Sequence, residues 1–443
     1  MKESRYNTWL DDGPTTYVHN GFSGRTVSMP LSQREPTRRF IAGDDTVTID
    51  PALIDTLVDA RAIVADHADE LDLLRQRYER TRRNRGRFHL TIVPSLGCDL
   101  DCPYCFEAKH PSLLDDDVET SLLRLVDQKL SAVRSLGVLW YGGEPLVGLK
   151  SLLSLSDNFI ARCSAAGVAY AAEIVTNGHL LTAPTARLLR ERRVEAAQVT
   201  IDGPPEVHDR RRPLAGGRGT FEQLLANVTA VAGILDVTVR VNLDTANVGE
   251  APRLLEILAA AGLAGRIGVY AAQVVATTAN PLAPSARYAT ACLSRTGFAE
   301  AEEQFTEAAA RLGFVTAGLP EPTGAPCTAV RDNELVIGSR GEIYKCTETI
   351  GDPAEVIGNL RNWPQAGDRL SKWLTYDPFG DPECRTCVAL PVCMGGCAYH
   401  AMTSAAPDTR CSTFRLRTEQ QIRRVVTGRR GPSALRSPTA GPS

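Results

Sequence analysis

The stretch Cys98-Asp99-Leu100-Asp101-Cys102-Pro103-Tyr104-Cys105 places three cysteines in a Cys-x3-Cys-x2-Cys spacing. It follows Phe88–Val93, where apolar and polar residues alternate as they do in a half-buried strand. Three thiolates on one short loop hold three irons of a cubane iron–sulfur cluster and leave the fourth iron open to a reactive cofactor. The alternative for such a triad is structural zinc, which usually takes four protein ligands. The stretch therefore predicts a metal-binding loop directly after a strand.

Seven more cysteines lie in roughly the last quarter of the chain, again in regular spacings. Cys163 and Cys292 fit no spacing, and we expect them to be small buried hydrophobic residues. Cluster spacings in a chain of 443 residues differ from the framework of a small secreted disulfide protein, so reducing cytoplasm is the expected compartment. The seven cysteines are Cys327, Cys346, Cys384, Cys387, Cys393, Cys397 and Cys411, with Gly341 between the first two.

The charge and hydropathy of the sequence limit the kinds of partner that the protein can bind. Lys and Arg number 49 and Asp and Glu number 52, which gives a formal net charge of −3. This balance argues against general binding of nucleic acid. Because the sequence has no run of about 18 apolar residues, it predicts no transmembrane helix and no membrane partner. The length suits two or three domains of about 100–200 residues each.

Between the two cysteine groups, short β-rich runs alternate with helical patterns, as is typical of parallel β/α units. One helix is expected to begin at Thr220-Phe221-Glu222-Gln223, which has the form of a capping box. The order predicts a barrel-like α/β fold with six such units. The six expected strands are Phe88–Val93, Val138–Tyr141, Tyr170–Val175, Ala197–Ile201, Thr238–Leu243 and Arg266–Val274.

The residues that end these strands are candidate site residues, because a parallel barrel gathers its reactive site at the carboxyl ends of its strands. The second strand ends in Gly142-Gly143-Glu144-Pro145, and Asn177 follows the third. Thr200 and Asp202 end the fourth strand, and Asn242 lies at the end of the fifth. Each asparagine alone is more often a cap or turn residue than a ligand contact.

The triad and the strand before it resemble the signature of the radical S-adenosylmethionine (SAM) enzymes. In that family the open iron chelates SAM, which is cleaved to a hydrogen-abstracting 5′-deoxyadenosyl radical. The resemblance implies that Cys98, Cys102 and Cys105 are the catalytic cluster ligands. A guanidinium in Val207–Arg212 could hold the SAM carboxylate. The implied SAM-binding residues are Gly142, Gly143, Glu144, Pro145, Asn177, Thr200, Asp202 and Asn242, with Glu144 helping to hold the amino group.

The C-terminal cysteines match the pattern of SPASM domains, found in radical SAM enzymes that modify peptides and proteins. The resemblance implies two auxiliary [4Fe–4S] clusters beside the one that binds SAM. The second auxiliary cluster has only three matched cysteines. Its fourth iron is either open or bound by Cys292. The implied ligands are Cys384, Cys387, Cys393 and Cys411 for one cluster and Cys327, Cys346 and Cys397 for the other.

The N-terminal segment differs from the rest. Thr16–His19 and Thr26–Met29 flank Asn20-Gly21, which is typical of a β-hairpin, and helical patterns follow. This segment resembles the winged-helix modules with which peptide maturases hold a leader peptide, and the alternative is a lid or structural cap. The expected domains are 1–86 for this small α+β module, 87–315 for a partial (β/α)6 radical SAM barrel, 316–415 for the SPASM domain and 416–443 for a helix end and disordered tail.

The resemblance implies a maturase that modifies a ribosomally synthesised precursor peptide (RiPP), for example by a thioether or carbon–carbon cross-link. Its implied cofactors are SAM and [4Fe–4S] clusters, and its partners are the peptide and an electron donor such as flavodoxin or ferredoxin. One alternative is an anaerobic sulfatase maturase, which carries an acid directly after an auxiliary-cluster cysteine. Here Thr347 follows Cys346, and Glu348 comes one position later. The other is a non-catalytic iron–sulfur protein that binds peptides.

Overall fold

The computed structural model describes residues 1–275, 283–288, 291–362, 367–403 and 407–428. They form two compact units, which we describe separately. The hairpin unit comprises Met1–Arg82, Ala317–Pro326 and Asp377–Arg430, and the barrel unit comprises Arg83–Thr316 and Cys327–Tyr376. Within the described ranges, no helix has both the length and the apolar composition needed to cross a bilayer. Most of the tail that was expected to be disordered, from residue 429 onward, lies outside them.

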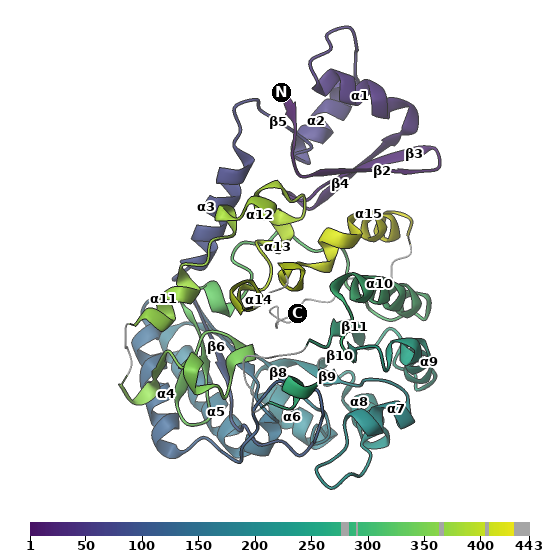
Figure 1. Cartoon of the computed structure of the whole chain (residues 1–443). Coiled ribbons are helices and arrows are strands. Elements are labelled where there is room, and N and C mark those ends of the chain that lie inside the picture. The colour runs from purple at the N-terminus through teal and green to yellow at the C-terminus, as the bar shows by residue number, and fades with distance from the viewer. Residues whose placement is uncertain (276–282, 289–290, 363–366, 404–406, 429–443) are drawn as a thin grey trace. The chain divides into compact units, whose positions relative to one another are not determined.

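A nine-stranded sheet with the order β11-β10-β9-β8-β7-β6-β12-β13-β14 forms the centre of the barrel unit (Figure 1). The strands from β6 to β11 pair in parallel, and their crossover helices flank the sheet. The strands are β6 (Arg87–Ile92), β7 (Ser135–Trp140), β8 (Ala169–Thr176), β9 (Val194–Thr200), β10 (Asp236–Leu243), β11 (Gly268–Gln273), β12 (Glu334–Ile337), β13 (Glu342–Tyr344) and β14 (Gly358–Asn359). The helices are α4 (Asp116–Leu130), α5 (Leu149–Ala166), α6 (Ala183–Glu191), α7 (Pro205–Arg211), α8 (Phe221–Val231), α9 (Ala251–Ala260), α10 (Arg295–Arg311) and α11 (Asp368–Leu374).

The six predicted strands are confirmed as β6 to β11, with small shifts at their ends. They form because apolar, often β-branched residues run along them and are covered on both faces. In β10, for example, Val237, Val239, Val241 and Leu243 are buried on one face, and Thr238 and Asn242 are buried on the other. Such runs are typical of parallel strands, whose two faces both lie against other elements.

Helix α8 begins where predicted, but the predicted capping box is wrong. The Thr220 hydroxyl does not cap the helix and donates to the carbonyl of Arg212 at 2.7 Å. The Asp209 carboxylate instead accepts hydrogen bonds from Thr220 N at 2.8 Å and Phe221 N at 2.9 Å. A contact from α7 therefore replaces the local cap, because Asp209 satisfies N–H groups at the start of α8 that have no partner within the helix.

Three short strands extend the sheet beyond the predicted six. β12 pairs in parallel with β6, with Leu335 opposite Leu90, and β13 and β14 continue the sheet antiparallel. Gly341 turns the chain between β12 and β13 with a φ of +84°, a conformation that glycine adopts without steric cost. The glycine of the C-terminal pattern thus serves the hairpin that leads to Cys346.

The hairpin unit contains a three-stranded antiparallel sheet, in the order β2-β3-β4. The predicted hairpin is confirmed, since β3 and β4 pair from Asn20 opposite Arg25 to Thr15 opposite Pro30. β2 was not predicted, because its sequence ends in two aspartates that are uncommon in strands. The strands are β1 (Lys2–Glu3), β2 (Asn7–Asp12), β3 (Thr15–Asn20), β4 (Arg25–Pro30) and β5 (Ile63–Val64).

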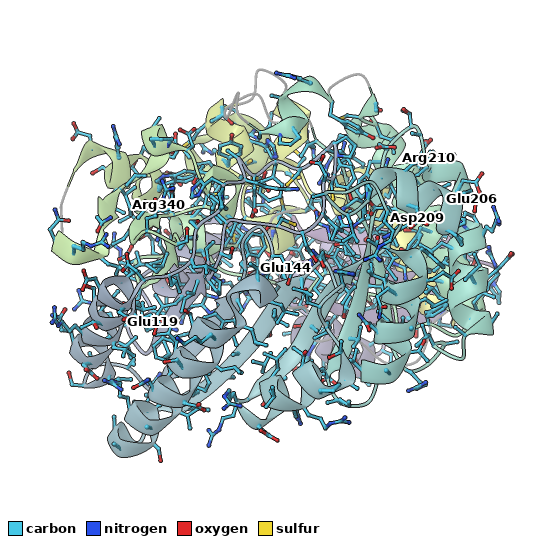
Figure 2. The ribbon with its side chains drawn as sticks, turned by 90° about the horizontal axis from the view of Figure 1, so that it is seen from below. Glu119, Glu144, Glu206, Asp209, Arg210 and Arg340 are labelled. Carbon is cyan, nitrogen blue, oxygen red and sulfur yellow. The ribbon has the colours of Figure 1, made fainter. Side chains whose placement is uncertain are left out.

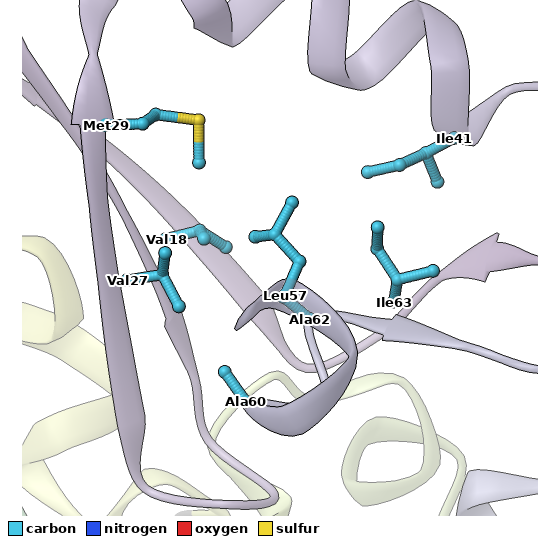
Figure 3. Packing of buried hydrophobic residues seen from close by; sticks show 8 residues of the cluster. All are labelled: Val18, Val27, Met29, Ile41, Leu57, Ala60, Ala62 and Ile63. Atoms are coloured by element: carbon cyan, nitrogen blue, oxygen red, sulfur yellow. The ribbon is translucent and has the colours of Figure 1, made fainter. Parts of the chain in front are cut away.

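An apolar core joins this sheet to the first helices of the unit (Figure 3). Ile41 of α1 and the fully buried Leu57 of α2 pack with Val18 and Met29 of the sheet. The cysteine-rich part of the unit consists of shorter helices, apart from α15. The helices are α1 (Arg34–Ile41), α2 (Pro51–Asp59), α3 (Glu70–Arg82), α12 (Pro382–Thr386), α13 (Leu390–Cys393), α14 (Ala398–Thr403) and α15 (Thr413–Val426).

Candidate active site

The three cysteines of the triad line one cavity in the barrel unit. They lie on the loop after β6, and residues from the carboxyl ends of β7, β8, β9 and β10 line the same cavity. This is the arrangement expected of a parallel barrel, where strand ends distant in sequence meet. The predicted site residues in the described lining are Cys98, Cys102, Cys105, Gly142, Gly143, Asn177, Thr200 and Asn242.

Gly142 and Gly143 lie against the backbone that leads into the cysteine loop. Gly143 N donates to Ser95 O at 3.2 Å, and Glu144 N donates to Gly97 O at 2.9 Å. A Cβ atom on Gly143 would lie only 2.7 Å from Gly97 O. The glycines therefore let the β7 end approach the cysteine loop itself, a role beyond the expected approach to a ligand.

Gly143→Ala is expected to displace the cysteine loop, because the added methyl group meets rigid backbone. We expect the affinity of the triad for its cluster to fall about tenfold or more, which corresponds to about 1.4 kcal/mol. Gly249→Ala is the matched control, since a Cβ there meets nothing within 4 Å. Iron analysis after reconstitution measures the effect. Equal iron in the two variants would contradict the prediction.

Glu144, labelled in Figure 2, is fully buried, and three groups of the protein donate hydrogen bonds to its carboxylate. Oε1 accepts from Leu146 N at 2.9 Å and Thr176 Oγ1 at 2.8 Å, and Oε2 accepts from Asn177 N at 2.7 Å. Burial raises the pKa of Glu144 to about 7, against these hydrogen bonds. The described lining includes neither Glu144 nor Pro145. Glu144 joins the ends of β7 and β8, and its predicted contact with SAM stays a prediction.

Asp99, inside the triad, ties the cysteine loop to the end of β8. Asn177 Nδ2 donates to Asp99 Oδ1 at 2.6 Å and to Cys98 Sγ at 3.8 Å. His179 Nδ1 lies 2.7 Å from the second oxygen of Asp99. Sequence reasoning missed Asp99 and His179, although an acid within the triad and a histidine just after a strand end were available signals.

The arginines of Val207–Arg212 have three different environments. Arg210 is exposed (Figure 2), and Arg211 is buried in an ion pair with Asp244 at 2.6 Å. Arg212 lines the cavity beside the cysteines. Asp202 has no exposed surface and supports the lining from behind, where it accepts a hydrogen bond from Asn242 N at 3.0 Å.

The buried Glu107 and Glu348 and the half-buried Arg240 also line the cavity, and sequence reasoning missed two of these three charged residues. Burial raises the pKa of Glu107 to about 8 and that of Glu348 to about 7, the latter against the charge of Arg240. Glu107 and Arg240 were not predicted. Arg240 lies two positions before Asn242 on β10, and residues two apart share a face of a strand, so the period of the strand was the available signal.

Two thiols of the triad, those of Cys98 and Cys105, are hard to ionise without a metal. Burial raises the pKa of Cys98 to about 11 and that of Cys105 to about 12, in both cases against the positive charge of Lys109. Iron must therefore displace protons when it binds here. Three thiols on one loop beside a cation fit a cubane cluster, which carries its ligands on separate irons. In the described part of the chain, no three Cys, His, Asp or Glu side chains form a group able to hold a single metal ion.

The cysteines assigned to the first auxiliary cluster gather within the hairpin unit. The thiols of Cys384 and Cys393 interact electrostatically with that of Cys387, and Cys393 also with Cys411. Arg415 Nη1 donates to Cys411 Sγ at 3.1 Å. These residues fit one cluster. For the second cluster, Cys327 and Cys346 belong to the barrel unit and Cys397 to the hairpin unit, and their joint ligation stays a prediction.

The two unassigned cysteines have different surroundings. Cys163 is buried in α5, as predicted. Cys292 is only half-buried and packs against the apolar cluster that contains Cys102 and Tyr104. It therefore lies beside the triad of the barrel unit.

The chain is similar to known radical SAM proteins over part of its length. Residues 92–268 match the model of the radical SAM superfamily. The serine-type anaerobic sulfatase-maturating enzyme of Klebsiella aerogenes is 27% identical over 146 residues, which is 32% of this chain and 36% of that enzyme. The enzyme of Klebsiella pneumoniae with the same name is also 27% identical, over 32% of this chain and 37% of its own. The chain thus matches about a third of the length of these curated relatives.

Solved structures share the fold over a greater length. Native anSMEcpe with bound AdoMet and the Cp18Cys peptide has a TM-score of 0.58 and 16% identity, over 77% of this chain and 97% of that one. Streptococcus suis SuiB bound to the precursor peptide SuiA has a TM-score of 0.50 and 15% identity, over 93% of this chain and 99% of that one. The chain therefore contains a radical SAM domain and resembles the radical SAM maturases.

Proposed function

We propose that this protein is a radical SAM peptide maturase that acts on a ribosomally synthesised precursor peptide. The gathering of Cys98, Cys102 and Cys105 with Gly143 and Arg212 around one cavity carries the proposal. When bound, the cluster and SAM would supply a 5′-deoxyadenosyl radical that takes one hydrogen atom from the peptide. Closing a thioether or carbon–carbon cross-link, or forming a related modification, would then release a proton and one electron, for which an auxiliary cluster is our proposed acceptor. A cytoplasmic flavodoxin or ferredoxin provides the electron.

The residues of this chain bind and orient these groups. The three thiolates of the triad would each hold one iron of the cluster, and the hydrogen bond from Asn177 to Asp99 keeps their loop in place. Arg212 Nε is buried and has no hydrogen-bond partner among the described residues. Since a guanidinium binds a carboxylate with two parallel hydrogen bonds, Arg212 is suited to the SAM carboxylate. The auxiliary clusters hold the cysteine-rich segment together.

The test is anaerobic co-expression with a precursor peptide encoded beside the gene, followed by mass spectrometry of that peptide. A cluster-dependent loss of two hydrogens would support a cross-link. An unchanged mass requires a second run in deuterated solvent, which detects epimerisation. If the reduced, reconstituted protein leaves SAM intact, the enzyme is excluded and the non-catalytic peptide-binding alternative is favoured.

Formylglycine formation is the second candidate, because Glu348 lines the cavity that contains the triad. A sulfatase maturase needs a base near the attacked serine or cysteine. Glu348 is buried and carries no hydrogen bond or ion pair to the described residues, so it is available for that role. Conversion of a sulfatase-type peptide, with no change in the neighbouring precursor, would favour this candidate.

The N-terminal sheet is our proposed site for the leader of the precursor. β4 is an edge strand, and a groove runs between it and α2, lined by Arg25, Val27, Asp55 and Val58 among others. An extended peptide can pair with such an edge while its apolar side chains fill the groove. Val58 leaves 44% of its surface exposed there, an apolar contact available to such a peptide.

Val58→Glu is expected to weaken binding of the precursor about tenfold, because a charge then faces the apolar part of the groove. Fluorescence polarisation of a labelled full-length precursor measures the dissociation constant. Leu188→Glu on α6 is the matched control, since Leu188 is 38% exposed and belongs to the barrel unit. Equal affinities of the two variants would count against the groove.

A further inference from the structure

The hydroxyl group of Tyr104 joins the cysteine loop to the barrel. Tyr104 lies between Cys102 and Cys105 in the triad, and its ring is buried. Its Oη hydrogen-bonds to the Asp202 carboxylate and accepts from Arg212 Nη1 at 2.8 Å. The loop that carries the thiols is therefore attached at its centre to two charged side chains.

Both charged partners of this hydroxyl are themselves fixed. Asp202 N donates to His208 Nδ1 at 3.1 Å, and Asp202 Oδ1 accepts from Asn242 N at 3.0 Å. Arg212 N donates to His208 O at 2.7 Å, and Arg212 O accepts from Thr220 Oγ1 at 2.7 Å. The attachment thus rests on the ends of β9 and β10 and on the segment from α7 to α8.

The ring of Tyr104 is held as well. The guanidinium of Arg211 lies over it, 4.9 Å from its centroid, within the range of a cation–π contact. Arg211 is in turn fixed by Asp244 at 2.6 Å and by Tyr288 Oη at 3.1 Å. Tyr104 therefore has little freedom to move, and neither does the loop around it.

We propose that Tyr104 and Arg212 are positioning residues for the reactive cluster: the tyrosine hydroxyl fixes the cysteine loop, and the arginine sets the charge beside it. This inference rests on the proposed function. Arg212 lines the cavity and interacts electrostatically with Cys102. Reduction adds one electron to the cluster, so a neighbouring cation stabilises the reduced state and raises the reduction potential.

Tyr104→Phe tests the anchoring role, because it keeps the buried ring and removes only the hydroxyl. We expect a chelator to remove iron from the triad about tenfold faster, equivalent to about 1.4 kcal/mol, since the variant removes the hydrogen bonds that join the loop to the buried side chains of Asp202 and Arg212. Tyr170→Phe on β8 is the control, because Tyr170 is a buried tyrosine that packs on Phe159 of α5. Parental rates in Tyr104→Phe would overturn the anchoring role.

Arg212→Gln tests the effect of the arginine charge on the cluster. The measured quantity is the midpoint potential of the cluster bound by the triad. It is followed by electron paramagnetic resonance during titration with dithionite, in the absence of SAM. Omitting SAM separates this effect from binding of the SAM carboxylate. The spectrum of Cys98→Ala protein supplies the auxiliary-cluster background to subtract. We expect a more negative potential in Arg212→Gln and a return toward the parental value in Arg212→Lys, which keeps the charge. An unchanged potential in Arg212→Gln would overturn this part.

Failure of this inference can be told apart from failure of the proposed function. If the parental protein shows no change in its reduced-cluster spectrum when SAM is added, the proposed function fails. If the parental spectrum does change, and both variants match the parental protein in iron release and potential, only the positioning roles fail.

Discussion

Cys98→Ala is expected to abolish reductive cleavage of SAM while leaving most of the auxiliary iron in place. Cys98 lines the cavity and is one of only three thiols on its loop, so its loss leaves too few ligands for the reactive cluster. Loss of a residue that merely supports a metal ligand already costs about 10–100-fold in affinity or activity, and loss of a ligand should exceed that. The cysteines Cys384, Cys387, Cys393 and Cys411 belong to the hairpin unit and not to the barrel unit that carries this loop, so we expect their iron to remain.

The measurement for Cys98→Ala is the yield of 5′-deoxyadenosine from reduced, reconstituted protein, together with its iron and sulfide content. Cys163→Ala is the matched control, because Cys163 is a buried cysteine in α5 that lies outside both cysteine groups. We expect this control to cleave SAM at the parental rate. Parental cleavage by Cys98→Ala would show that the triad does not hold the reactive cluster.

Cys387→Ala is expected to lower both the iron content and the stability of the protein. Cys387 lies just after α12, a helix of five residues, among the thiols of Cys384, Cys393 and Cys411. Short helices bury little apolar surface, so metal binding supplies much of the folding free energy of such a segment. The expected loss is about one cubane, roughly four irons per chain.

Iron analysis and thermal unfolding of the reconstituted protein measure the effect of Cys387→Ala. Thr386→Ala is the matched control, since Thr386 is the exposed neighbour of Cys387 and its hydroxyl bonds only within its own short helix. A variant that keeps both the iron and the unfolding temperature of this control would remove Cys387 from the ligand set. Loss of stability without loss of iron would also show that Cys387 is not a cluster ligand.

The barrel could be predicted from the sequence because its strands are strongly apolar and most are followed by glycine or polar residues. The cavity residues Gly143, Asn177, Thr200 and Asn242 all follow from one rule, that parallel strands present their carboxyl ends together. Local patterns were less reliable where tertiary contacts compete. Thr220 has the sequence of a cap, yet its hydroxyl bonds elsewhere.

Other features depended on distances that a sequence does not contain. The hydrogen bonds that the Glu144 carboxylate accepts from Leu146 N, Thr176 Oγ1 and Asn177 N join the ends of two strands, and the sequence alone does not indicate them. Glu348 follows a cysteine far along the chain from the triad, and only the addition of β12 and β13 to the sheet brings it to the cavity. Neither arrangement leaves a periodic signal.

The pairing of β12 with β6 has a consequence for how the protein can be shortened. β6 carries the cysteine loop at its end and would be the edge of the parallel sheet if the chain stopped before Glu334. An edge strand with unpaired N–H and C=O groups is a template for aggregation. β12 covers this edge. The barrel is therefore completed by a strand that begins more than sixty positions after the end of β11. A chain truncated to the radical SAM segment would therefore be prone to self-association, and its loss of activity would say little about the auxiliary clusters.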